Sequence, residues 1–264
     1  MQFRRLQPEF ATTREIAEIT NTILNGKLNN TGTFNLSTGW TNTTTINDER
    51  ISIDSKILLL PFSDLAENRT APYGEFTKNT DQLAPSVGNT AVVDWTTEHE
   101  LNGMYLDGVN TSRIYVRNDG IYKTLFSLQL ANANNDAEYA DVWFRVNGSD
   151  ITDSGKRFGL PARKSNGDPS HLTGTASHVL DLNAGDYIEI AGATSSSNVS
   201  LEHYAASTTP YTRPSIPSAQ INITYIAPYS MDNVYVSAQT NGTATVSHFA
   251  NDTSDVKYAY VIIG

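Results

Sequence analysis

Apolar and polar residues alternate most regularly between Gly120 and Gly148. In the first half, one face is formed by Tyr122, Phe126, Leu128 and Leu130, and the other by Lys123, Ser127 and Gln129. In the second half, Val142, Phe144 and Val146 alternate with Trp143 and Arg145. Period-two alternation is typical of strands in a sheet with one buried and one wet face. We therefore predict two long strands, Gly120–Leu130 and Asp141–Asn147, joined by a polar loop and serving as a scaffold.

Shorter runs of strand-forming residues continue on both sides of this stretch. They predict further strands at Ala91–Trp95, Arg113–Arg117, His178–Leu182, Asp186–Ala191, Asn198–Tyr204 and Ala219–Ile226. Eight short strands with long polar loops fit an antiparallel sandwich of jelly-roll type over residues 67–228. The segment Asp150–Thr173 is rich in Pro and Gly and the segment Ala205–Ser218 is rich in Pro, so we expect both to be exposed loops.

The flanking segments predict a second, smaller β-structure. Polar strand candidates are Thr31–Ser37, Thr41–Asn47, and Val234–Ser237 with Thr243–Ser247 around an Asn241-Gly242 turn. Two runs, Ser55–Phe62 and Lys257–Gly264, are apolar on both faces, which predicts the central strands of one small sheet. Neither flank holds enough strands for a core of its own. We therefore predict a mainly β fold in which residues 29–66 and 229–264 form one discontinuous module with the jelly roll inserted.

The first 28 residues predict an N-terminal arm followed by a short helix. Thr12 and Glu15 have the spacing of a capping box, and Asn25-Gly26 ends the helical pattern. Its apolar stripe consists of Ile16, Ile19, Ile23 and Leu24. A lone helix of about 13 residues is marginal in water. Two interpretations stay open: the helix covers the adjacent sheet, or it self-associates or docks on a partner.

Composition and charge exclude several classes of function. The net charge is −10, which repels nucleic-acid phosphates and anionic membranes, so we expect no nucleic-acid partner. The absence of cysteine excludes disulfides, zinc–thiolate sites and thiol nucleophiles. The sequence has no secretory h-region and no run of about 18 apolar residues, so we expect neither secretion nor membrane insertion.

Residue types that serve in catalysis and metal binding are present, but they do not have the spacing that such sites require. The histidines of the insert, His171, His178 and His203, form no close pair of the kind found in zinc sites. The DLNAGD motif, Asp181 to Asp186, indicates a hairpin turn and lacks the pattern of an EF-hand, although weak calcium binding by exposed loop carboxylates stays open. Asp136, Glu138 and Asp141 lie close enough in the sequence to suggest a glycosidase pair, but this cluster fits a solvated loop tip better. We expect no catalytic residue, no cofactor, no resident metal and no enzymatic activity.

Several spaced motifs resemble known families. GIYKTLFSLQLAN, DVWFRVNG, LNAGDYIEIAG and INITYI resemble the jelly rolls of the C1q/TNF-like group, and more closely their versions in bacteriophage structural proteins, over residues 110–228. NGKLNNTGTFNLSTGWTNTTTINDERISIDSKILLLPFS and VYVSAQTNGTATVSHFANDTSDVKYAYVIIG resemble paired segments of phage tail-fibre and appendage modules.

The resemblance implies a non-enzymatic virion protein of tail-fibre, neck-appendage or decoration type, assembled in the host cytoplasm. It implies a homotrimer that docks on other virion proteins by its N-terminus and presents the jelly roll to the host surface or to the virion. A pure assembly or cementing protein of neck or capsid is the alternative. A glycan-degrading appendage is a third hypothesis, and no carboxylate constellation supports it.

The densest positive charge predicts a contact loop. It consists of Lys156, Arg157, Arg163 and Lys164, and we group His171 with it. One interpretation is that these residues pair with carboxylates of a neighbouring subunit in the trimer. The other is a surface for a host glycan or another virion protein. Loop aromatics that could stack on sugars are Tyr204, Tyr211 and Trp95, although such residues more often belong to the core.

Overall fold

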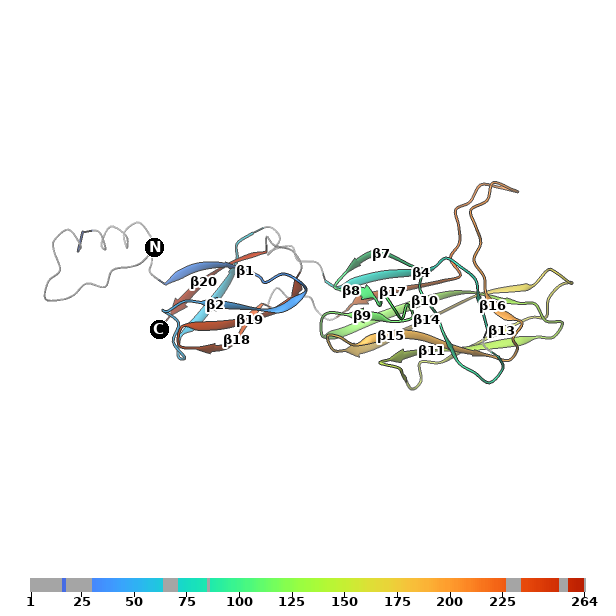
Figure 1. Cartoon of the computed structure of the whole chain (residues 1–264), viewed down its shortest axis with the longest axis horizontal. Coiled ribbons are helices and arrows are strands. Elements are labelled where there is room, and N and C mark those ends of the chain that lie inside the picture. Colours follow the sequence, from blue (N-terminus) through green and yellow to red (C-terminus); the bar gives the residue numbers. More distant parts are fainter. Residues whose placement is uncertain are drawn as a thin grey trace. The chain divides into compact units, whose positions relative to one another are not determined.

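The computed structural model describes residues 16–17, 30–63, 71–84, 86–226, 234–251 and 256–263. The chain divides into two compact units, Thr70–Tyr229 and Met1–Arg69 with Ser230–Gly264, whose strands are labelled in Figure 1. Every strand pairing in the described residues is antiparallel. The mainly β prediction is therefore confirmed.

The larger unit is a sandwich of two seven-stranded sheets, consistent with a jelly roll. The first sheet contains β4 (Tyr73–Lys78), β5 (Gln82–Leu83), β7 (Thr97–Asn102), β10 (Gly120–Asn132), β14 (Ser170–Leu182), β16 (Val199–Leu201) and β17 (Ala219–Tyr225). The second contains β6 (Ala91–Val92), β8 (Met104–Leu106), β9 (Ile114–Val116), β11 (Glu138–Val146), β12 (Ser149–Asp150), β13 (Lys156–Leu160) and β15 (Tyr187–Thr194).

The two long strands predicted from alternation lie in different sheets. β10 pairs with β14 along its whole length and with β17 and β16 on its other side, whereas β11 pairs with β15, β13 and β12. Their apolar faces meet in the core, where the rings of Phe126 and Phe144 lie 5.3 Å apart. Gly120 opens β10 with φ 146°, and a Cβ there would lie 2.2 Å from the Tyr225 ring, so this position needs glycine.

The exposed-loop prediction for Asp150–Thr173 is wrong in part. β13 lies within this segment, and β14 begins at Ser170 instead of His178. The first half of β14 carries small and polar residues, so its sequence has no apolar alternation. Its buried positions include Gly174, which lies under the ring of Phe158. The other predicted loop, Ala205–Ser218, contains no strand.

Within its described residues, the smaller unit contains two three-stranded sheets instead of the one predicted. β1 (Thr31–Asn35), β20 (Lys257–Ile263) and β3 (Lys56–Pro61) form one sheet, and β18 (Tyr235–Thr240), β19 (Thr243–Asn251) and β2 (Thr41–Asn47) form the other. The core between them contains Ile46, Ile51, Ala244, Val246, Tyr260 and Ile262. β18 and β19 form the predicted hairpin, and Gly242 in its turn has φ 87°.

The prediction that Ser55–Phe62 is a central strand is wrong. In the described part of this sheet, β20 is central and β3 lies at the edge. Leu58 and Leu60 are each 54% exposed, because β3 has core contacts on one face alone. Apolar residues on both faces of β3 therefore do not report burial within this chain.

The predicted docking helix lies mostly outside the described residues. Ile16 and Ala17 have helical backbone and are exposed, whereas Ile19, Ile23 and Leu24 are not among the described positions. The helix and its stripe therefore stay predictions. Within the described part of the chain, no helix has the length and apolarity that crossing a bilayer requires.

Candidate contact surface

Asn132 organises the end of the sandwich where the candidate contact loops meet. Its side chain is fully buried. The amide nitrogen donates to the carbonyls of Asp136 (2.9 Å) and Pro161 (2.8 Å), and the amide oxygen accepts from the Asn134 backbone (2.8 Å). One side chain thus joins the loop after β10 to the loop after β13. The sequence pattern gave no sign of this role, since Asn is common in exposed loops.

Arg163 and Lys164 lie in the second of these loops. The backbone nitrogen of Arg163 donates to the Asn134 carbonyl (2.8 Å), and its guanidinium donates to Asn135 Oδ1 (2.8 Å) and to the Ala133 carbonyl (3.2 Å). Lys164 is exposed, and its backbone nitrogen donates to the Asp168 carbonyl in a tight turn. Arg163 therefore holds the neighbouring loop, while the side chain of Lys164 extends from the surface.

Lys156 and Arg157 lie on β13, where strand pairing separates them from the loop. Arg157 forms two hydrogen bonds of 2.7 Å with the Asp141 carboxylate, and its guanidinium carbon lies 4.0 Å from the centre of the Tyr139 ring. The bond to Asp141 raises the pKa of Arg157. The carboxylate partner of Arg157 thus comes from its own chain, from the adjacent strand β11.

His171 belongs to a polar cluster at the base of a projecting loop. Its Nδ1 lies 3.0 Å from the Tyr204 hydroxyl and 3.5 Å from Glu202 Oε2, and the Tyr204 hydroxyl donates to the same Glu202 oxygen (3.1 Å). Burial, followed by the bond to Glu202, raises the pKa of Tyr204 to about 12. The hydroxyl therefore stays protonated and remains a donor at neutral pH. We call His171, Glu202 and Tyr204 the arm-base cluster.

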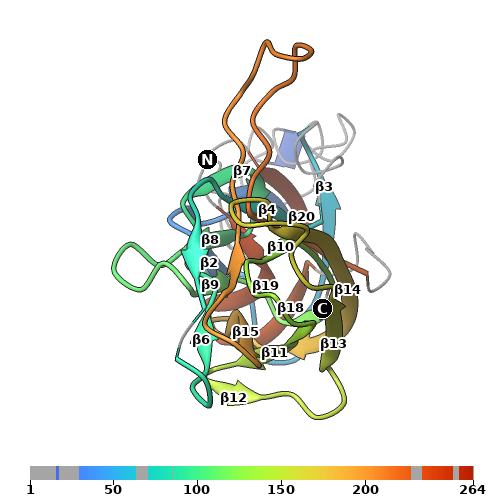
Figure 2. The ribbon, with the colours of Figure 1, turned by 90° about the vertical axis from the view of Figure 1, so that its right-hand side faces the viewer.

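Residues 205–217 form an arm that projects away from both sheets (Figure 2). Its two sides are joined by paired backbone hydrogen bonds between Ser207 and Arg213 and between Tyr204 and Ile216. The Arg213 guanidinium donates to the Ala205 carbonyl (2.9 Å) and lies 5.8 Å from the Tyr204 ring centre. Tyr211 is 66% exposed, so an aromatic side chain stands free on the arm.

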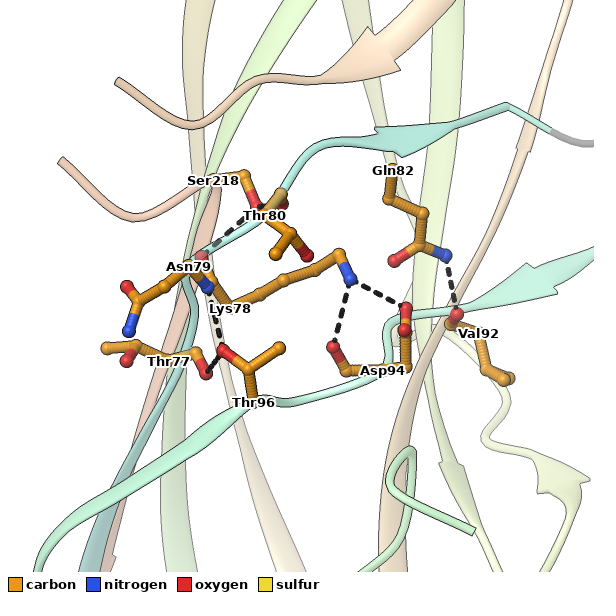
Figure 3. A network of polar contacts seen from close by, with 9 residues as sticks. All are labelled: Thr77, Lys78, Asn79, Thr80, Gln82, Val92, Asp94, Thr96 and Ser218. Carbon is orange, nitrogen blue, oxygen red and sulfur yellow. Dashed lines mark hydrogen bonds and ion pairs between the residues drawn. The ribbon is translucent and has the colours of Figure 1, made fainter. Parts of the chain in front are cut away.

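The other end of the arm is fixed by a buried polar network at Ser218 (Figure 3). The Ser218 hydroxyl donates to the carbonyls of Thr80 (2.7 Å) and Lys78 (3.2 Å). The Lys78 side chain is 3% exposed, and its ammonium donates to Asp94 Oδ1 (2.9 Å) and to the Asp94 carbonyl (3.3 Å). A buried ammonium needs such a partner. Hydrogen bonds at Tyr204 and at Ser218 therefore hold the arm to the sandwich at both of its ends.

The other residues considered for chemistry have structural contacts. The ring of His178 stacks on Phe144, and the backbone of His203 donates to Asp81. Asp186 accepts from the Asn183 backbone and the Asn147 side chain, which stabilises the predicted turn, and these bonds outweigh partial burial and lower its pKa. In the described ranges, no three His, Asp or Glu side chains converge as metal ligands would. Trp95 is 1% exposed, so it belongs to the core and cannot stack on a sugar.

The larger unit also contains a small apolar cavity between its sheets. Its volume is about 60 Å³, and its walls include Leu128, Leu130, Val142, Ile190 and Leu201. Ligand pockets are usually about 300–1,000 Å³. A sugar or cofactor does not fit, so we assign this cavity to core packing and the candidate contacts to the loops and the arm.

Comparisons with known proteins leave the family open. No protein-family model matches the chain, and no curated protein matches it. Among solved structures, the chain is similar to the globular domain of the zebrafish complement 1qA protein, with 13% identity, coverage of 60% of this chain and 98% of that chain, and a TM-score of 0.35. The antiparallel sandwich described above rests on the strand pairings of this chain itself.

Proposed function

We propose that this chain is a non-enzymatic structural protein of a bacteriophage particle, of tail-fibre, neck-appendage or decoration type. The observation that carries the proposal is the split organisation: both chain ends contribute strands to one small unit, and the sandwich is inserted between them. Such an arrangement suits a base that attaches by its N-terminal segment and an inserted unit that makes contacts. The sequence resemblance to phage appendage modules supports the same assignment.

The mechanism is binding by shape and multivalency. The resemblance to C1q/TNF-like jelly rolls supports a homotrimer, which would present three copies of the arm. Three weak sites on one particle-bound trimer raise avidity without any new contact. Tyr211 on each arm supplies an exposed aromatic ring, a side chain common in recognition surfaces.

Deletion of the inserted unit tests the proposal. A phage whose chain has residues 70–229 replaced by a short Gly/Ser linker should still incorporate the protein, detected by immunoblot of purified particles. The same particles should lose adsorption to host cells. Removal of residues 1–28 should abolish incorporation instead. Full adsorption without the inserted unit would refute a role in host attachment.

A cementing or assembly protein that never meets the host is the second candidate. It is favoured by the contacts of Arg157 and Arg163, which are satisfied within the chain and leave less free positive charge for a ligand. It predicts normal adsorption but fragile particles when the sandwich is removed, measurable as loss of titre on heating.

A glycan-degrading appendage is the third candidate. Asp141 is held by Arg157, and Glu138 accepts from Asn134 and Ser195, so both carboxylates have structural partners. Reducing ends released from host polysaccharide by the purified protein would revive this candidate.

A further inference from the structure

Five asparagines of this chain are followed by glycine, namely Asn25, Asn102, Asn147, Asn166 and Asn241. In such a pair, the backbone nitrogen of the glycine can attack the side-chain carbonyl carbon of the asparagine, because glycine has no Cβ to block the approach. Asparagine is for this reason a thermolabile residue. The structure describes the last four pairs, so it shows which of them the fold leaves free to react.

The pairs at Asn147 and Asn241 have reacting groups that are held by hydrogen bonds. The Asn147 amide oxygen accepts from the Tyr187 backbone (3.0 Å), and its amide nitrogen donates to a nearby carboxylate (2.7 Å). At Asn241, the attacking nitrogen is that of Gly242, and it donates to the Ile51 carbonyl (2.8 Å). Attack at either pair therefore requires a hydrogen bond to break first.

The pair at Asn102 is closed by packing. Gly103 is buried, and a Cβ at this position would lie 2.9 Å from the Asn118 side chain. The Asn102 amide nitrogen donates to the Ala71 carbonyl (3.3 Å). Movement of the glycine nitrogen toward the side chain would disturb these contacts, so the fold disfavours attack here as well.

Asn166 differs from these three because its pair lies in an exposed turn. Residues 165–168 form the turn, which is closed by a hydrogen bond from the Asp168 backbone to the Ser165 carbonyl (3.1 Å). Asn166 and Gly167 are both exposed, and a Cβ at Gly167 would meet no atom within 4 Å. The Gly167 nitrogen donates to no backbone carbonyl in the described part of the chain. The reacting groups can therefore approach each other without displacing a packed side chain.

The contact between Asn166 and Arg163 favours the reaction. Nη1 of Arg163 donates to Oδ1 of Asn166 (3.3 Å). Negative charge develops on this oxygen when the carbonyl carbon is attacked, and a donor placed at the oxygen stabilises that charge. The guanidinium therefore lies where it assists attack, and it leaves the attacking nitrogen free.

We propose that Asn166 is a self-modification site, which the fold leaves reactive while it protects the other described pairs. The Gly167 nitrogen loses its proton to solvent and bonds to the side-chain carbon of Asn166, and the bond from that carbon to the amide nitrogen breaks as ammonia leaves. Water then opens the cyclic imide at either of its carbonyls, which gives aspartate or isoaspartate. The reaction exchanges the amide nitrogen for an oxygen of water and needs no oxidant or reductant.

The product changes the charge of the loop after β13, residues 161–169. A new carboxylate beside Arg163 attracts the guanidinium, which in the unmodified chain donates to Asn135 Oδ1 (2.8 Å) and to the Ala133 carbonyl (3.2 Å). Isoaspartate also lengthens the backbone of the turn. Modification therefore weakens the junction between the two loops as the protein ages, and this inference does not depend on the proposed function.

The test follows the four described pairs in the purified full chain by peptide mapping with mass spectrometry during incubation at mildly alkaline pH. We expect Asn166 to convert about fivefold or more faster than Asn241, because a net hydrogen bond on the Gly242 nitrogen slows attack by about that factor. Enzymatic methylation counts isoaspartate independently. Asn166→Gln should remove most of this signal and Asn241→Gln little of it, since the longer glutamine side chain forms its ring more slowly.

Unfolding separates the effect of the fold from that of the sequence. In guanidinium chloride the four pairs should convert at similar rates, because each then reacts as a free segment. A preference for Asn166 that persists in the unfolded chain would overturn the role of the fold. Equal or faster conversion of another described pair in the native protein would also overturn it, and an Asn166 that does not convert would overturn the site itself.

Discussion

Replacing Asn132 by alanine should loosen both contact loops at once. The substitution removes three hydrogen bonds, to Asp136, Pro161 and Asn134, from a side chain with no exposed area. Each bond contributes about 1 kcal/mol net, and a buried partner left unsatisfied costs about 1–3 kcal/mol. Water can hydrogen-bond to the loop groups that lose Asn132 as a partner, which limits the loss. We therefore expect the free energy of unfolding of the larger unit to fall by about 2–4 kcal/mol.

Asn132→Asp should cost more than Asn132→Ala at neutral pH. A carboxylate accepts hydrogen bonds but does not donate them, so it would face the carbonyl oxygens of Asp136 and Pro161. Burial beside these oxygens raises the pKa of the new carboxyl in the folded state. Its protonation on folding is then favoured at low pH, so the deficit of the variant should shrink as the pH falls.

Urea unfolding followed by tryptophan fluorescence measures the loss, because Trp95 and Trp143 lie in the larger unit. Hydrogen exchange of residues 133–137 and 161–169 should show loss of protection in both loops. Asn89→Ala is the matched control, since Asn89 is exposed and its amide bonds one serine hydroxyl. Stability of N132A within about 0.5 kcal/mol of wild type would refute the role assigned to this side chain.

Three further changes test other parts of the chain. Asp94→Ala should lower the unfolding free energy of the larger unit by about 2–4 kcal/mol because it leaves the buried Lys78 ammonium without its carboxylate, and Lys78→Met should cost less in urea unfolding. The hydrogen bond from Arg50 holds the pKa of Asp48 well below its usual range, so this carboxylate stabilises the small unit above the unfolded pKa of about 3.9. Asp48→Asn should therefore cost about 1–2 kcal/mol at neutral pH, and the difference in thermal stability should shrink as the pH falls from that value toward the much lower pKa of the folded state. Tyr211→Ala should change stability by less than about 0.5 kcal/mol yet slow phage adsorption, whereas an unchanged adsorption rate would argue against the arm as a contact.

Strands that bury apolar residues on one face could be predicted from the sequence. β10, β11 and β15 show the alternation, and the structure places each close to its predicted range. β4 was missed because its buried positions include Thr77 and Lys78, which carry no apolar signal. Polar residues in this strand are buried with hydrogen-bond partners from distant segments, and a local pattern cannot report those.

The contacts of the predicted contact residues could not be read from their positions in the sequence, for the same physical reason. Clustering of positive charge along the chain grouped Lys156 and Arg157 with Arg163 and Lys164, but strand pairing separates the two pairs. The partner of Arg157 lies 16 residues earlier, on β11, and the partner of His171 lies on the segment after β16. The exposure of the loop Ala205–Ser218 was predicted from its proline content, since loops of this composition suit the surface, but its projection as an arm was not predicted.

β3 and β20 both carry apolar residues on both faces, yet they occupy different positions in their sheet. The pattern correctly placed β20 at the centre of its sheet, but the same pattern in β3 belongs to an edge strand with an exposed face. An apolar run shows that a strand tolerates burial on both faces, but its place in the sheet depends on which segments pair with it. Both neighbours of β20, which are β1 and β3, come from the other end of the chain. A local pattern therefore could not distinguish the central strand from the edge strand, because strand order is decided by pairing between segments far apart in the sequence.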